Sequence, residues 1–243
     1  MDKKLIKRVL DVAYLAKEGH IPTSLSVLDI LYVLYDKHIK HGDNHFILSK
    51  GHASLGLYTI LEHFNLLDNN LNEFCKFNSI LGGHPTNKIK NVKTSTGSLG
   101  HGLPIGVGMA MSEKIKNTNN KIFVLIGDGE ANEGTIWESA LLASHHNLNN
   151  LYCIMDYNRS NDRALKLDNV LSKFKAFNWD CYEIDGHNHD EILSKTSIIS
   201  NDKPVFILAN TIKGYGIKIM ENKPEWHHKT PTLEEYNKII ETL

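Results

Sequence analysis

The sequence predicts an α/β fold, a doubly wound and mainly parallel sheet with helices on both faces. Short apolar runs rich in β-branched residues alternate with longer segments of helical periodicity along the whole chain. This alternation is typical of parallel strands joined by crossover helices, and the right-handed crossover rule supports it. A chain of 243 residues is long enough to bury a full core, and we expect residues 1–243 to form a single domain.

Each expected element rests on a local pattern. We expect helices where apolar residues recur at i, i+3 and i+4, and strands where short apolar runs lie between turn residues. In chain order these are a helix ending near Gly19, a helix over 27–35, a strand over 46–48, a helix ending near His63, a helix over 104–115, strands over 121–126 and 151–155, a helix over 171–177, a strand over 180–184, a helix over 190–200, a strand over 204–210 and a closing helix from Thr232.

Polar residues near the expected helix ends predict further local structure. Ser24 or Ser26 is expected to cap the second helix. His52 is expected near the N-terminus of the third helix, where backbone N–H groups bind anions. His41 and His45 have the spacing of zinc ligands, but the sequence offers no evident third ligand, so we do not infer a zinc site.

Composition excludes several classes of function. Lys and Arg total 27 against 28 Asp and Glu, so no basic field attracts nucleic acid or an anionic membrane surface. No apolar run approaches the roughly twenty residues of a membrane span, and charged residues interrupt the N-terminal apolar stretch, unlike a signal peptide. The three cysteines are odd in number and far apart, which argues against a disulfide framework. We therefore expect a cytoplasmic protein that binds a small molecule.

The stretch 121–161 organises the rest of the chain. Its first strand ends in Gly-Asp-Gly at 127–129, and the strand over 151–155 is expected to lie parallel beside it. In such a βαβ unit the carboxyl ends of both strands open onto one crevice, where α/β sheets bind ligands. We therefore expect Asp128 and Asn158, about thirty residues apart, to face each other.

These residue types describe a metal-diphosphate site. A carboxylate and an amide oxygen suit Mg²⁺, which completes its octahedron with water and phosphate oxygens. Gly127 and Gly129 let the backbone approach a ligand closely, and the helix expected after Glu133 offers its N-terminal end to an anion. The alternative is a plain strand-turn-helix with an acidic cap, which Gly-Asp-Gly alone does not exclude.

With the spacing and the second strand included, the pattern resembles the diphosphate motif of thiamine diphosphate enzymes. Glu-x-Asn-Glu-Gly-x-x-Trp-Glu at 130–138 resembles the transketolase branch, and the resemblance runs from Gly19 to His227. It implies thiamine diphosphate and Mg²⁺ as cofactors, with Asp128, Asn158 and the Ser160 carbonyl as metal ligands. The implied cofactor-binding residues are His52, Gly97, Ser98, Leu99, Gly127, Asp128, Gly129, Glu130, Asn158 and His227.

Most of the 14 histidines are expected to be ordinary solvated or hydrogen-bonded side chains. Four stand in turns at the ends of expected elements: His20, His52, His84 and His227. By the resemblance, His52 and His227 contact the cofactor diphosphate and substrate hydroxyls, while His20 and His84 hold the ketose hydroxyls and move protons. Imidazole suits this work because its unperturbed pKa lies near ~6.5. The resemblance also places Glu133 in an acidic network near the subunit interface, and we count it with the catalytic residues.

The chain departs from the family pattern in two turns. Ile-Pro-Thr at 21–23 replaces a glycine-rich turn, so we expect a different local backbone. Arg-Ser-Asn-Asp-Arg at 159–163 stands where the family has apolar residues that support the bent cofactor. Leu165 is our candidate for that support.

The resemblance also implies a missing half. In the family, the glutamate that activates the cofactor lies in a second, pyrimidine-binding domain. The chain therefore resembles the N-terminal subunit of a split transketolase, with a separate C-terminal partner and two copies of each subunit. The implied reaction transfers a two-carbon ketol unit from a ketose to an aldose, either of them free or phosphorylated. The alternatives are the α-subunit of a 2-oxo acid dehydrogenase and a cofactor-binding scaffold without turnover.

Overall fold

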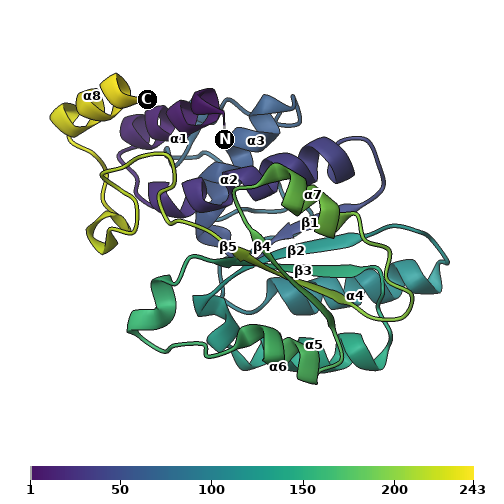
Figure 1. Ribbon diagram of the computed structural model, residues 1–243. Helices are drawn as coiled ribbons and strands as arrows, with labels where there is room; N and C mark the ends of the chain where they lie inside the picture. Colours follow the sequence, from purple (N-terminus) through teal and green to yellow (C-terminus); the bar gives the residue numbers. More distant parts are fainter. Residues whose placement is uncertain (1) are drawn as a thin grey trace.

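The computed structural model describes residues 2–243, except for the side chain of Arg163. At its centre lies a five-stranded sheet in the order β1-β2-β3-β5-β4, and each strand pair is parallel. The strands are β1 (His45–Leu48), β2 (Ile122–Gly127), β3 (Leu151–Tyr157), β4 (Asp180–Asp185) and β5 (Val205–Asn210). Helices cover both faces (Figure 1), so the predicted fold class is confirmed.

The helices follow the predicted alternation with small shifts at their ends. They are α1 (Lys3–Ala16), α2 (Ile21–Leu34), α3 (Ser54–His63), α4 (Gly102–Ile115), α5 (Gly134–His145), α6 (Val170–Ala176), α7 (His189–Thr196) and α8 (Leu233–Thr242). Short helical turns are η1 (Tyr35–Ile39), η2 (Gly51–Ala53), η3 (Leu71–Glu73), η4 (Gly129–Asn132), η5 (Ser160–Arg163) and η6 (Pro224–Trp226). Within residues 2–243, no helix is long and apolar enough to cross a membrane.

Two hydrophobic cores lie on opposite faces of the sheet. In β2, Phe123 and Leu125 pack into the core formed with α1, α2, α3 and α7, whereas Val124 and Ile126 pack into the core with α4, α5 and α6. Every residue of β2 is buried, because a parallel strand covered on both faces meets no solvent. This explains why β2 and β3 appear in the sequence as continuous apolar runs.

The winding of the chain reverses between β3 and β5. The crossovers α4, α5 and α6 lie on one face, while α7, which joins β4 to β5, lies on the other (Figure 1). Because β4 forms the edge, β5 returns to pair with β3. Such a reversal opens a crevice at the carboxyl ends of the strands.

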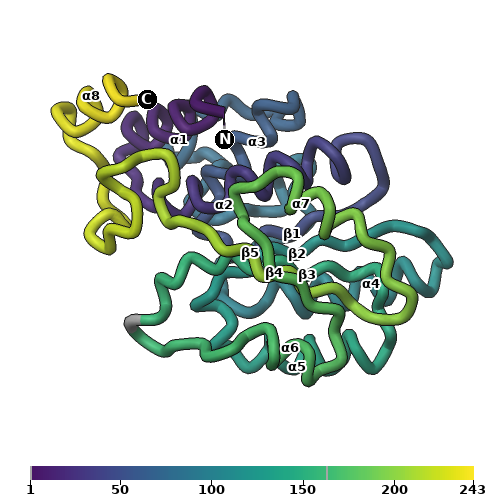
Figure 2. Tube along the Cα trace, viewed as in Figure 1, coloured from purple at the N-terminus to yellow at the C-terminus, as the bar shows by residue number. Residues whose placement is uncertain are grey.

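The two ends of the chain meet on one side of the molecule. Figure 2 shows the last helix, α8, next to α1. Tyr236 donates a hydrogen bond to Asp11 over 2.7 Å, and its ring stacks on Tyr14 at 4.4 Å. The C-terminal segment is thereby fixed where it returns past the crevice.

The predicted cap of the second helix is wrong. α2 begins at Ile21, six residues before the expected start, and Ser24 and Ser26 are buried inside it. Pro22 lies in the first turn, where its missing N–H costs no helical hydrogen bond. His20 precedes the helix in a left-handed conformation with φ 61°, so the local backbone is set by this turn.

Candidate functional site

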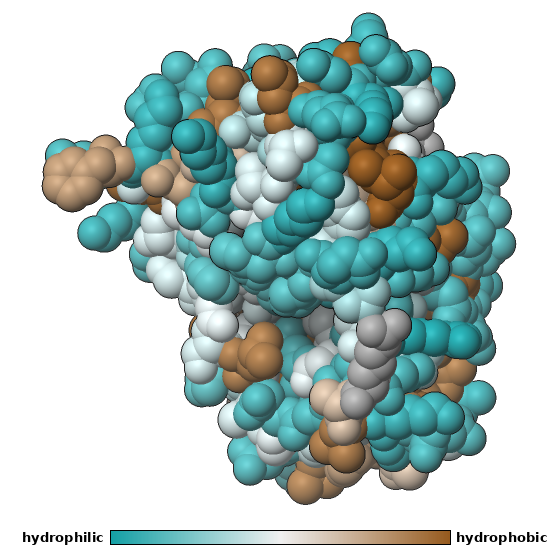
Figure 3. Space-filling model, turned by 90° about the vertical axis from the view of Figure 1, so that its left-hand side faces the viewer, coloured by the Kyte–Doolittle hydropathy of each residue, from teal (hydrophilic) through white to brown (hydrophobic). Residues whose placement is uncertain are grey.

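A cavity of about 370 Å³ opens at the carboxyl ends of the strands. Its lining residues come from the segments that follow β1, β2, β3 and β5 and from the start of α2. Figure 3 views the molecule from this side and shows the surface hollowed there. The cavity therefore lies where the reversed winding predicts a ligand site.

The cavity brings together most of the residues that the sequence singled out. These lining residues are His20, His52, His84, Gly97, Leu99, Gly127, Asp128, Gly129, Glu130, Asn158, Ser160 and His227. Ser98 and Glu133 are exposed and lie outside the lining. Four lining residues were not predicted: Thr23, Lys50, Asn161 and Lys213.

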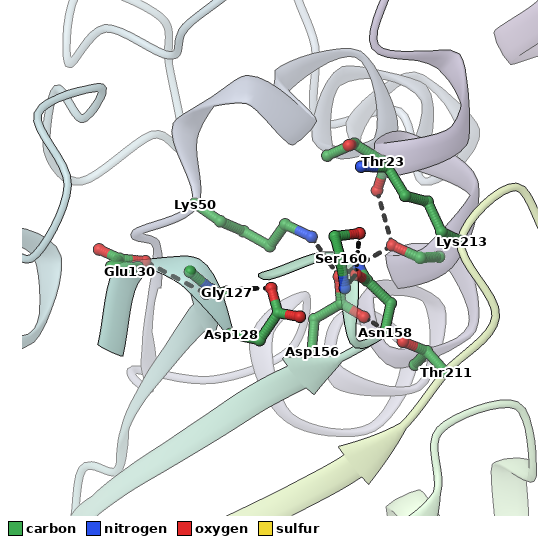
Figure 4. A network of polar contacts seen from close by, with 12 residues as sticks. Thr23, Lys50, Gly127, Asp128, Glu130, Asp156, Asn158, Ser160, Thr211 and Lys213 are labelled. Carbon is green, nitrogen blue, oxygen red and sulfur yellow. Dashed lines mark hydrogen bonds and ion pairs between the residues drawn. The ribbon is translucent and has the colours of Figure 1, made fainter. Parts of the chain in front are cut away.

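A buried ion pair forms the floor of the site. Lys50 follows β1 and is 2% exposed, while Asp156 lies in β3 and is fully buried. Lys50 donates to Asp156, as do Ser26 over 2.8 Å, Asn158 over 2.9 Å and Thr211 (Figure 4). Burial alone would raise the pKa of Asp156, but the Lys50 charge and these hydrogen bonds lower it below its usual range.

Asp128 lies beside this pair in a different environment (Figure 4). It is 6% exposed, and its oxygens accept from the backbone N–H groups of Gly129 at 2.8 Å and Asn161 at 3.3 Å. In the described chain, no side chain donates to it. Burial, and then the charge of Asp156, raise the pKa of Asp128. A divalent cation relieves this unfavourable state, since it supplies the missing positive charge.

Asn158 completes an oxygen-rich donor set. Its Nδ2 donates to Asp156 over 2.9 Å, which orients the amide, and its Oδ1 accepts from the backbone N–H of Ser160 at 3.1 Å. A carboxylate, an amide oxygen and a backbone carbonyl are donors that Mg²⁺ accepts. Among the described residues, no group of three or more His, Cys, Asp or Glu side chains forms another metal site, so His41 and His45 gain no support as zinc ligands.

Glu130 fastens the glycine loop to the sheet. It is 2% exposed and accepts from the N–H groups of Gly100 at 2.8 Å and Gly127 at 3.2 Å, and from Ser49. Burial raises the pKa of this carboxyl. Both of its oxygens are engaged by the chain itself, so Glu130 shapes the cavity wall that it lines.

Gly97 lets this loop lie against His84. Its φ of 154° is rarely adopted by residues with a side chain, and a Cβ there would stand 3.2 Å from the His84 ring. Any other residue would therefore push the loop or the imidazole out of place. The close approach leaves room for a ligand between them and the Asp128 side of the cavity.

The histidines form a cluster on the cavity wall. The ring centre of His20 lies 5.5 Å from that of His52 and 5.4 Å from that of His227. Burial, followed by nearby cations and imidazoles, lowers the pKa of His20 to about 4 and that of His52 to about 2. These rings are neutral at neutral pH and can donate or accept hydrogen bonds to hydroxyl groups.

Lys213 supplies a positive charge beside the histidines. It is 8% exposed, and its Nζ donates to Nδ1 of His227 over 2.7 Å. Burial and the charge of Lys50 lower the pKa of Lys213 to about 8. No carboxylate in the described chain forms an ion pair with it, so its charge favours an anionic ligand. The residues present thus fit a divalent cation together with a diphosphate.

One predicted anion contact does not hold. The N-terminus of α5 was expected to face the ligand, but η4 intervenes, and α5 begins at Gly134 outside the cavity lining. The extra turn places Gly129 rather than Gly134 at the cavity. Glu133 precedes α5 in an extended conformation and is exposed.

Comparison with known proteins gives a consistent match. Residues 3–240 match the family described as "Transketolase, thiamine diphosphate binding domain". One of the two chains of the apulose-4-phosphate transketolase of Phocaeicola vulgatus is 36% identical over 96% of this chain and 89% of its own length. "6-deoxy-6-sulfo-D-fructose transketolase subunit SqwG" of Clostridium sp. is 34% identical over 93% of this chain and 88% of its own length.

Longer proteins match over part of their length. Human "Transketolase" is 34% identical over 94% of this chain but only 39% of its own length. The solved transketolase of Campylobacter jejuni superposes with a TM-score of 0.85 at 28% identity, covering 100% of this chain and 43% of that chain. The chain thus spans about two fifths of the solved transketolases it matches.

Proposed function

This chain belongs to the transketolase family as a thiamine diphosphate-binding domain, and we propose that it is the N-terminal subunit of a two-component transketolase. The proposed reaction moves a two-carbon ketol unit from a ketose to an aldose, either of them free or phosphorylated. The observation that carries the proposal is the convergence of Asp128, Asn158 and the histidines on one cavity. The relatives named as subunits, which this chain covers almost fully, support the division into two chains.

The donor set of the cavity assigns the cofactor contacts. Asp128, Asn158 and the Ser160 carbonyl would hold Mg²⁺, and His52, Lys213 and His227 would hold the diphosphate. The glycine loop at 97–99 would border the cofactor rings. When bound, thiamine diphosphate stabilises the carbanion that C–C cleavage generates.

The chain's own residues bind the sugar and move its protons. His20 is neutral at neutral pH because burial lowers its pKa, so it can accept a proton from a ketose hydroxyl. His84 lines the same cavity and is assigned the same kind of work. His227 is oriented by the hydrogen bond from Lys213, which leaves its other ring nitrogen for a ligand. Glu133, exposed at the start of α5, is assigned to the subunit interface.

An apolar face beside the cavity is assigned to the partner subunit. Leu99 is 40% exposed and Ile105 on α4 is 38% exposed, and on α5 the exposure of Leu141 is 61% and of Leu142 44%. Covering these side chains removes apolar surface from water. We place the partner's pyrimidine-binding domain here, in a cytoplasmic heterotetramer with two copies of each subunit.

The test is a reconstitution. The chain is purified alone and with its co-expressed C-terminal partner, and each sample is assayed with thiamine diphosphate, Mg²⁺ and both ketose and 2-oxo acid donors. We expect ketol transfer only from the complex, because the chain by itself supplies only the diphosphate end of the site. Robust turnover by the chain alone would refute the split enzyme, and turnover of 2-oxo acids alone would refute the transketolase assignment.

A further inference from the structure

A buried carboxylate and two histidines lie behind the cavity, outside its lining. Asp29 of α2 is 1% exposed. One of its oxygens accepts from Nδ1 of His187 at 3.0 Å, and the other from Nε2 of His189 at 2.7 Å. His187 stands between β4 and α7 with a side chain that is 6% exposed, whereas that of His189 is 41% exposed.

The second ring nitrogen of His187 determines its tautomer. Nε2 accepts a hydrogen bond from the backbone N–H of Ile212 at 2.9 Å. An N–H donor requires an unprotonated nitrogen, so the ring proton lies on Nδ1 and faces Asp29. The ring of Tyr215 stacks on His187 at 3.6 Å and 17°, which fixes the plane of the imidazole. His187 therefore joins Asp29 to the backbone after β5 in one defined orientation.

Ile212 is the middle of a segment whose neighbours both enter the site. Thr211 donates to Asp156 on the cavity floor. Lys213 donates to His227 on the cavity wall. One residue further on, Gly214 donates to the carbonyl of Pro22 in α2 over 3.0 Å. The bond from Ile212 to His187 is thus the anchor between the two side chains that reach the site.

We propose that His187, oriented by Asp29, is a positioning residue that places Lys213 for the diphosphate of the cofactor. The proposal rests on the proposed function, since Lys213 acts there as a diphosphate ligand. A shift of about 1 Å in a positioning group can cost roughly 10²-fold in rate. Because His187 touches neither the cavity nor its ligands, its effect passes through the backbone of Ile212.

Three substitutions separate the two hydrogen bonds of His187. His187→Gln places an acceptor near the Nε2 position and keeps the Ile212 bond. His187→Asn retains only a group facing Asp29. His187→Phe keeps the ring on Tyr215 and removes both bonds. His189→Gln is the matched control, because His189 contacts the same carboxylate but not Ile212.

Binding of thiamine diphosphate with Mg²⁺ to the complex of chain and partner is measured by calorimetry. We expect His187→Phe and His187→Asn to weaken binding at least about tenfold, and His187→Gln and His189→Gln to stay within about threefold of wild type. In a double-mutant cycle, His187→Phe should add little to Lys213→Met, since both act through the same ammonium. Wild-type affinity in the Phe and Asn variants, or fully multiplying effects in the cycle, would overturn the proposal.

A readout without cofactor keeps the proposal distinct from the proposed function. In the cofactor-free complex, amide exchange at Ile212 should be slow in wild type and His187→Gln and fast in His187→Phe. Nitrogen NMR of labelled histidine should show His187 protonated on Nδ1. Fast exchange at Ile212 in wild type would refute the anchor. Failure of the wild-type complex to bind thiamine diphosphate, with Ile212 protected, would refute the proposed function instead.

Discussion

Two neighbouring strands end in carboxylates with opposite environments. Asp156 in β3 is fully buried, and four side chains donate to it, from Ser26, Lys50, Asn158 and Thr211. Asp128 follows β2, is 6% exposed, and accepts from two backbone N–H groups. The pKa of Asp156 is lowered and that of Asp128 is raised.

The difference separates a structural charge from a functional one. Burial raises the pKa of both carboxyls, so only the partners differ. The ionised form of Asp156 is held by Lys50 and stabilises the fold. The ionised form of Asp128 is unfavourable until a cation arrives. A buried charge that the chain leaves poorly paired therefore marks the ligand site.

The largest effect on stability is expected at Asp156. Asp156→Asn leaves the Lys50 ammonium buried without a counter-charge, and we expect the free energy of unfolding to fall by roughly 3–5 kcal/mol. Urea unfolding followed by circular dichroism measures this change. Asp128→Asn is the control. Because the folded-state pKa of Asp128 is raised, its charge destabilises the fold at neutral pH, and stability should stay equal or rise. Equal losses in both variants would erase the contrast.

The histidine wall should behave like the Asp128 side, with effects on function rather than stability. His20→Ala, His84→Ala and His227→Ala should each lower the kcat of ketol transfer by roughly 10²-fold or more. Cofactor affinity, measured on the same complexes, should fall less. His41→Ala, at an exposed position outside the cavity, should match wild type. Loss of activity in the His41 variant while the other three keep theirs would contradict the assignment.

A smaller effect on binding is expected at Lys213. Lys213→Met should weaken thiamine diphosphate binding about tenfold, since the anion loses one close positive charge. The pKa of Lys213 is about 8, so the wild-type complex should bind more tightly at pH 7 than at pH 9. His20 and His52 are already neutral across this range. Titrations of both proteins at the two pH values test this, and an unchanged pH dependence in Lys213→Met would exclude Lys213 as its source.

The fold could be predicted because its signals are local. β2 and β3 are buried on both faces, so their apolar runs are continuous and easily recognised. The start of α2 could not be predicted from its serines. Ser26 is buried because it donates to Asp156, which lies 130 residues away, and no local pattern reports such a partner.

The site could be predicted only where a motif marks it. Asp128, Asn158 and the histidines stand in glycine turns or at strand ends with family spacing. Lys50 was missed because its partner is 106 residues away. Lys213 stands at the start of a glycine turn just after β5. That lysine beside a strand end was the available signal.

The central claim is that Asp128 is reserved for the metal of the cofactor. Calorimetric titration of the complex with thiamine diphosphate, in the presence and absence of Mg²⁺, tests it most directly. We expect Asp128→Asn to abolish Mg²⁺-dependent binding at unchanged or higher stability, and Asn158→Ala to weaken binding less. Undiminished Mg²⁺-dependent affinity in the Asp128 variant would contradict the account.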